Sequence, residues 1–118
     1  MKQTFHCYLR PYRRRWGFTQ EELAHLLGCK SGTVISRLEK GERRPSLKIA
    51  LACYIIFDTP PHELFPGTFS RIEKCILKRT WDLYERVQGD PSATTRSKLD
   101  ALQEAIERAK GRSGQTDV

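Results

Sequence analysis

Apolar residues recur along this chain at the three- and four-residue spacings of α-helices, and no stretch alternates convincingly between apolar and polar residues as a strand would. Glycine and proline divide the helical stretches. The pattern predicts a first helix from about residue 9 to residue 16, a second over residues 20–27 and a third over residues 32–40. A glycine follows each of these helices and is expected to end it.

Residues with capping side chains stand in front of the second and third predicted helices. Thr19 precedes the second helix, and Glu22, three residues later, completes the sequence of a capping box. Ser31 is placed to cap the third helix. Two short helices joined by a glycine-bearing turn usually cross at about 90 to 120° instead of lying antiparallel. The sequence therefore predicts a helix-turn-helix.

Four more helical segments are predicted after the helix-turn-helix. Ser46 is expected to cap the nearly all-apolar segment LKIALACYIIF, HELF forms a short helical turn, and a long helix runs from about residue 68 to residue 88. The last helix is expected at about residues 97–110, with a loose tail from about residue 111. The predicted core of the first domain is Leu9, Leu23, Leu26, Leu27, Ile35, Leu38, Leu47, Leu51, Ile55 and Leu64.

These elements predict an all-α fold with two parts. Residues 1–66 form a five-helix domain, and residues 67–118 add two C-terminal helices. The helix at 68–88 has an apolar face wider than a monomeric surface helix needs, so the C-terminal part is expected to associate with a second copy of the chain. The alternative is that these two helices fold back onto their own domain.

The third predicted helix has little apolar surface. At about 100° per residue, Ile35 and Leu38 share one face of this helix. The opposite face is a polar stripe without an acidic residue, which we call the α3 stripe below; it consists of Thr33, Ser36, Arg37 and Lys40. Two short hydroxyl side chains beside two long cationic side chains indicate a surface that binds an anion.

Positive charge is concentrated in the first part of the chain. Residues 1–50 carry 11 Lys and Arg against 4 Asp and Glu, whereas the remaining residues carry 10 of each, so the first part accounts for the whole net charge of +7. A domain that docks on a polyanion gains from such a concentration. The charge therefore favours nucleic acid over a membrane surface as the partner.

Neither targeting nor catalytic patterns are evident. No stretch approaches the roughly 20 apolar residues of a membrane span, and the sequence MKQTFHCYLRPYRRR lacks the apolar centre of a secretory signal, so a cytoplasmic location is expected. The four cysteines are 22 to 24 residues apart without a Cys-x-x-Cys pair, and are expected to be reduced, mostly buried thiols. We therefore predict no enzymatic activity, no metal, no cofactor and no small-molecule ligand.

Residues 9–65 resemble the Cro/Xre-type helix-turn-helix domain of phage repressors and bacterial regulators. The resemblance lies in GFTQEELAHLLG, SGTVISRLEKGERRPSL and HELF, and covers about half of the chain. It implies sequence-specific binding to double-stranded DNA as a homodimer on a near-palindromic site, and hence a transcriptional regulator that acts as a repressor. The alternative function is a DNA-binding antitoxin or protein-interaction module whose C-terminal half binds a protein partner.

The resemblance also implies roles for individual residues. The helix at 32–40 enters the major groove, where Arg37 is the main specificity residue because Arg is the usual bidentate reader of guanine. The residues implied in base reading are Thr33, Ser36 and Arg37. Those implied in phosphate contacts are Gln20, Ser31, Lys40, Arg43 and Arg44. Lys30 is a further candidate for a phosphate contact because of its position at the entrance of the third helix. A structural ion pair is implied between Arg13 and Glu39.

The sequence departs from the family pattern at one place. Between Gly28 and Gly41 it has one residue more than usual, with Cys29 and Lys30 standing where a single apolar residue normally precedes the cap. Gly32 has no side chain to read a base. We therefore expect its backbone to approach a neighbouring segment or DNA closely.

Overall fold

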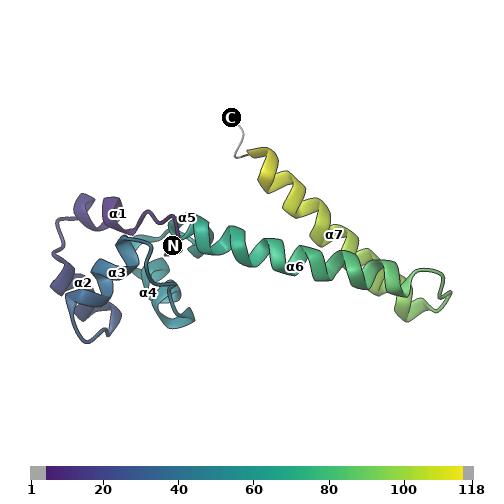
Figure 1. Cartoon of the computed structure of the whole chain (residues 1–118), viewed down its shortest axis with the longest axis horizontal. Helices are drawn as coiled ribbons and strands as arrows, with labels where there is room; N and C mark the ends of the chain where they lie inside the picture. The colour runs from purple at the N-terminus through teal and green to yellow at the C-terminus, as the bar shows by residue number, and fades with distance from the viewer. Residues whose placement is uncertain (1–4, 116–118) are drawn as a thin grey trace. The chain divides into compact units, whose positions relative to one another are not determined.

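The fold is all-α over the part of the chain that the structure describes. The computed structural model describes residues 5–115, with side chains to residue 112. Seven helices follow one another within this range (Figure 1): α1 (Leu9–Arg15), α2 (Gln20–Leu27), α3 (Gly32–Glu39), α4 (Leu47–Phe57), α5 (Pro61–Leu64), α6 (Pro66–Val87) and α7 (Ala93–Gln115). The predicted arrangement of five helices followed by two is confirmed.

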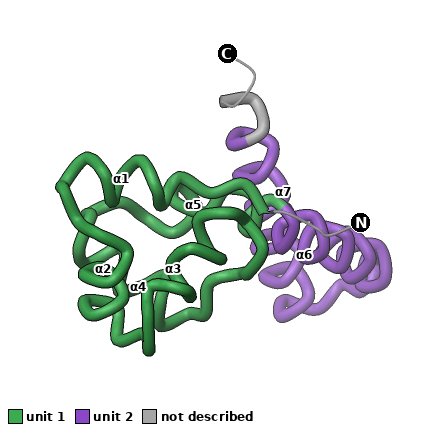
Figure 2. Tube along the Cα trace, turned by 60° about the vertical axis from the view of Figure 1, so that its left-hand side comes forward, with its two compact units in different colours: residues 1–70 green, residues 71–118 purple. Residues whose placement is uncertain are grey.

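The chain divides into two compact units, residues 1–70 and residues 71–118 (Figure 2). The first unit contains α1 to α5 and the first turn of α6, and the second contains the rest of α6 and α7. The division falls a few residues after the predicted boundary at residue 66. None of the described helices combines the length and the apolar character that crossing a membrane requires.

The predicted caps form in the first unit. Thr19 Oγ1 accepts a hydrogen bond from the Glu22 N–H (3.0 Å), and the Glu22 carboxylate accepts one from the Thr19 N–H (2.9 Å), which completes the capping box of α2. The Ser31 and Ser46 hydroxyls accept hydrogen bonds from backbone N–H groups in the first turns of α3 and α4. These local bonds explain why the sequence predicts where the three helices begin.

The end of α3 is fixed by a left-handed turn at Gly41 (φ 73°). The Gly41 N–H donates to the Leu38 carbonyl (3.1 Å) and the Glu42 N–H to the Arg37 carbonyl (3.0 Å), the bonding pattern of a Schellman motif. A Cβ atom at Gly41 would lie 2.5 Å from the Phe5 carbonyl oxygen. Glycine is therefore required here both by the turn and by the N-terminal segment packed against it.

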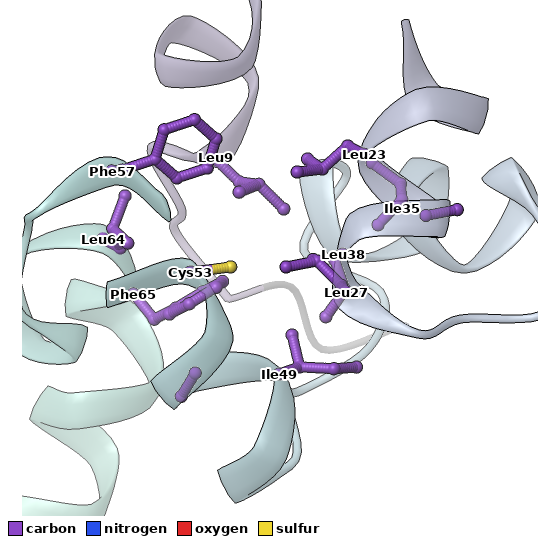
Figure 3. Close-up of a cluster of buried hydrophobic side chains, with 12 residues drawn as sticks. Leu9, Leu23, Leu27, Ile35, Leu38, Ile49, Cys53, Phe57, Leu64 and Phe65 are labelled. Atoms are coloured by element: carbon purple, nitrogen blue, oxygen red, sulfur yellow. The ribbon is translucent and has the colours of Figure 1, made fainter. Parts of the chain in front are cut away.

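The core of the first unit is built from α1 to α5 and the residue after α5 (Figure 3). Its side chains meet at a common centre and are Leu9, Leu23, Ala24, Leu27, Ile35, Leu38, Ile49, Ala50, Cys53, Phe57, Leu64 and Phe65. The predicted core positions on α1 and α3, and Leu64 on α5, are confirmed. On α2, Leu23 and Leu27 are buried as predicted.

Four predicted core residues are instead exposed, namely Leu26, Leu47, Leu51 and Ile55. Three of them belong to α4, which is apolar on nearly every side and carries Lys48 as its one charged residue, so its hydrophobic pattern does not say which face turns inward. Contacts with α2 and α5 decide the orientation of α4. The side chains that turn inward are Ile49, Ala50, Cys53 and Phe57. On α2, the third leucine, Leu26, lies outside the buried face.

The second unit is a hairpin of two antiparallel helices, residues 71–87 of α6 and α7. Arg112, near the end of α7, pairs with Glu73, near the start of the α6 segment, at 2.8 Å. Ile106 and Ala109 are buried between the helices. Leu99 and Leu102 are partly buried along the same seam, as their spacing predicts.

The last helix is longer than predicted at both ends. It begins at Ala93 because the Ser92 hydroxyl accepts a hydrogen bond from the Thr95 N–H (3.2 Å). The Asp90 carboxylate in turn accepts hydrogen bonds from the Ser92 N–H (3.0 Å) and from the Thr95 hydroxyl (2.8 Å). The bond from the Ser92 N–H is the main cause of a lowered Asp90 pKa. A loose tail was expected from about residue 111, whereas α7 continues to Gln115; residues 116–118 lie outside the described residues.

Candidate nucleic-acid interface

The α3 stripe lies on the surface of the first unit. Ile35 and Leu38 on the opposite face of α3 are almost completely buried, and α2 packs beside α3 as the preceding helix of the helix-turn-helix. The side chains of the stripe point away from this core; Thr33, Arg37 and Lys40 are exposed and Ser36 is partly exposed. The stripe is therefore available to a partner along the whole of α3.

A buried ion pair fixes α3 against α1. The Arg13 guanidinium donates from Nε to Glu39 Oε2 and from Nη2 to Glu39 Oε1 (3.1 Å), and the two side chains are only 11% and 4% exposed. Arg13 Nη1 also donates to the Phe18 carbonyl (2.9 Å), in front of α2. Two parallel charge-assisted bonds are strong and directional, so the pair sets how α3 sits on the unit.

Gln20 connects α2 to the same pair. Its Nε2 amide donates to Glu39 Oε1 at 3.1 Å, so Gln20 braces α3. A glutamine amide carries two N–H donors, and this bond uses one of them. The other N–H remains for a phosphate oxygen, which keeps the expected DNA contact of Gln20 chemically possible.

The start of α3 is held by α2 through a contact that the sequence does not reveal. The Gly32 N–H donates to Glu21 Oε1 at 2.8 Å. A Cβ atom at Gly32 would lie 2.6 Å from the same oxygen and 3.3 Å from the carbonyl carbon of Gln20. The close approach expected at Gly32 is therefore to α2. The only sequence signal for this contact is the acidic side chain in the first turn of α2. That signal does not identify Gly32 as the residue to which the acid binds.

Replacing Gly32 with alanine is expected to destabilise the first unit by about 1 kcal/mol, because the added methyl group displaces the Glu21 carboxylate from the Gly32 N–H. The free energy of unfolding from urea titrations measures the effect. In a Glu21→Ala background the same substitution is expected to be neutral or stabilising, since alanine favours helix over glycine. Equal losses in both backgrounds would show that Glu21 is not the cause.

Cations surround one flank of α3. A groove of 390 Å³ lies where α3 and α4 meet the turn after α2, and no acidic side chain is among its described lining residues. Lys30, Arg43 and Lys48 contribute its positive charges, above an apolar floor that includes Val34 and Ile49. Lys48 was not a candidate from the sequence, because it stands in a helix that the sequence marks only as apolar.

The cations near α3 are not neutralised within the described part of the chain. Lys30, Arg37, Lys40 and Arg43 are exposed and form no ion pair among residues 5–112. Arg44, also exposed, lies with its guanidinium carbon 5.7 Å from the centre of the Phe5 ring, and this cation–π contact directs it without removing its charge. The surface is therefore set to attract an anion.

The described residues offer no alternative site of metal chemistry. No group of three or more His, Cys, Asp or Glu side chains among them is placed to hold a metal ion. All four cysteines are free thiols, but they are less buried than expected: Cys53 is buried, Cys7 and Cys29 are partly buried, and Cys75 is exposed. Burial raises the pKa of Cys53 to about 12 and also raises the pKa of Cys7, so both remain protonated at neutral pH.

Known proteins are similar to part of this chain. Residues 9–64 match the family model described as helix-turn-helix. An uncharacterized HTH-type transcriptional regulator of Archaeoglobus fulgidus is 39% identical over 57 residues, which cover 48% of this chain and 80% of that protein. A second one from the same organism is 35% identical over 57 residues, 48% of this chain and 79% of that protein.

A longer match reaches beyond the helix-turn-helix. A putative HTH-type transcriptional regulatory protein of Pyrococcus furiosus is 32% identical over 88 residues, which cover 67% of this chain but only 28% of that protein. No solved structure gives a significant match. These relatives are archaeal, whereas the resemblance led us to expect relatives among bacteria and phages.

Proposed function

Because the chain belongs to the Cro/C1-type (Xre) helix-turn-helix family of DNA-binding transcriptional regulators, we propose that it is a cytoplasmic repressor that binds a near-palindromic site in double-stranded DNA as a homodimer. The α3 stripe is the observation that carries this proposal. It is polar, positively charged and exposed, and the Arg13–Glu39 pair holds it in place. Repression would follow from occlusion of a promoter.

In this proposal α3 enters the major groove, which is about 12 Å wide and admits one helix. Arg37, with Thr33 and Ser36, reads base edges. The backbone phosphates on either side are met by Gln20, Lys30, Ser31, Lys40, Arg43 and Arg44. Contacts to phosphate position the protein, whereas contacts to base edges give the sequence preference.

The proposed homodimer uses the second unit. Ile72, Ile76 and Leu83 lie along one edge of the α6 helix and are 51%, 50% and 40% exposed, so an apolar row is open to a second hairpin. Two copies related by a two-fold axis place their α3 helices on half-sites about 34 to 36 Å apart. A chain that is monomeric when isolated, and dimerises only with a different protein, would instead favour the antitoxin or protein-interaction alternative.

The proposal is tested by selecting bound duplexes from a random DNA pool with the full chain. A near-palindromic motif with two half-sites is expected, since each α3 reads a few base pairs and the dimer reads two such sets. Recovery of a pool without a shared motif would contradict sequence-specific binding.

Replacing Lys40 with alanine is expected to weaken binding to all duplexes alike, because Lys40 is assigned a phosphate and no base. The slope of log Kobs against log salt concentration should become shallower by about 0.9 for each half-site, the contribution of one phosphate contact, and hence by about 1.8 for the proposed homodimer. Titrations of the selected duplex and of an unrelated duplex at several salt concentrations measure it. Lys98→Ala, an exposed lysine on α7, is the matched control and should leave the slope unchanged.

A further inference from the structure

The outer face of α4 is an apolar surface that the first unit leaves uncovered. Leu47, Leu51, Tyr54 and Ile55 form one stripe along the helix and are 75%, 48%, 44% and 84% exposed. The inner face of the same helix is buried in the core. A helix that is apolar on nearly every side normally lies within a protein interior, and contiguous exposed patches of this kind mark interaction sites.

We infer that this stripe, which we call the α4 stripe, is an interface with a second copy of the chain, in which the two α4 helices pack antiparallel across a two-fold axis. The inference rests on the proposed function, because two copies bound to adjacent half-sites bring their first units next to each other. At such proximity the effective concentration of the second α4 stripe is far above that of any protein free in solution.

The residues of the α4 stripe are arranged in a self-complementary way. Leu51 stands at the centre, with Leu47 one turn before it and Ile55 one turn after it. Antiparallel packing about Leu51 places Leu47 of one chain against Ile55 of the second copy, and the same contact is repeated across the axis. An isologous interface requires this kind of match between the two halves of a single surface.

The charges at the ends of α4 favour the antiparallel arrangement and a second copy as the occupant. The start of α4 carries the exposed Lys48, whereas exposed Asp58 caps its end in a left-handed conformation (φ 50°). Neither side chain forms an ion pair among the described residues. Antiparallel packing brings the acidic end of each helix to the basic end of the other, and also opposes the two helix dipoles.

A cross-linking experiment tests the axis directly. In the full chain with Cys75→Ser, the substitution Leu51→Cys places one thiol on the proposed axis, where it meets its own copy. Oxidation with glutathione disulfide in the presence of the selected duplex is expected to give a disulfide-linked dimer. Leu26→Cys, at a leucine of similar exposure (46%) on α2, is the matched control and should remain monomeric on denaturing gels.

A second experiment measures the energetic role of the α4 stripe. Leu51→Glu combined with Ile55→Glu is expected to reduce cooperative binding to a duplex with two half-sites by about tenfold or more, while binding to a single half-site stays the same within about twofold. Asp58→Lys should act in the same direction, and Leu26→Glu should have no effect. Intact single-site binding also shows that the variants are folded.

The inference is overturned if Leu51→Cys gives no more cross-linked dimer than the Leu26→Cys control and the double glutamate variant keeps full cooperativity. That result is expected if residues 71–118 of the same chain, or a different protein, cover the α4 stripe. Failure of the proposed function gives a different result, because the wild-type chain would then not bind even a single half-site specifically.

Discussion

Replacing Arg37 with alanine is expected to remove the preference for one base in each half-site and to weaken binding to the selected duplex by about 1 to 3 kcal/mol per half-site. Arg37 is exposed at the middle of the α3 stripe and has no ion-pair partner among the described residues, so its guanidinium is available for a base edge. Selection from random duplexes, repeated with the variant, shows whether the base preference is lost. Titration of the selected duplex gives the loss of binding free energy.

Arg37→Lys separates base reading from simple charge. Lysine keeps the positive charge but lacks the planar fork that bonds guanine in two places, so this variant is expected to lose most of the preference and to keep the salt dependence of binding. The assignment of Arg37 as a base reader would be wrong if Arg37→Ala weakened every duplex equally, as Lys40→Ala is expected to do.

Replacing Glu39 with alanine is expected to lower the free energy of unfolding of the first unit by about 3 to 5 kcal/mol. The substitution leaves the guanidinium of Arg13, whose side chain is 11% exposed, without its counter-charge, and it removes the acceptor of the Gln20 amide. Urea unfolding followed by circular dichroism measures the change.

Two controls distinguish the buried pair from a general effect of losing a carboxylate. Glu42→Ala removes an exposed acid just after α3 and should change stability by no more than about 0.5 kcal/mol. Combining Arg13→Met with Glu39→Leu removes both charges and should recover most of the lost stability, since no unpaired charge stays buried. Equal effects of Glu39→Ala and Glu42→Ala would show that the pair contributes little.

Local signals explain which parts of the fold were predictable. The capping residues Thr19, Ser31 and Ser46 act within one helical turn, so the sequence alone indicates where α2, α3 and α4 begin. The start of α7 was predicted at about residue 97, whereas the helix begins at Ala93. The Ser92 hydroxyl accepts from the Thr95 N–H, and the Asp90 side chain accepts from Ser92 and Thr95, so these local bonds start the helix earlier.

Features that depend on how helices pack were not predictable from the sequence. The inward face of α4 is chosen by its neighbours, because its sequence is apolar on nearly every side. The bond from Gly32 to Glu21 joins residues on two helices and depends on the angle between them. The Arg13–Glu39 pair was expected only through the resemblance to the family. The first helix carries several basic residues, and the sequence does not indicate which of them faces Glu39.

Entry of the α3 stripe into the major groove is the contact on which the proposed function depends most. Titrating the isotope-labelled full chain with the selected duplex, and following backbone amide resonances, tests this contact residue by residue. Large shifts are predicted for Thr33, Arg37 and Lys40, with little change at Leu102 and Ile106 in α7. Amide resonances of α3 that stay in place, while the duplex binds through another surface, would contradict the account.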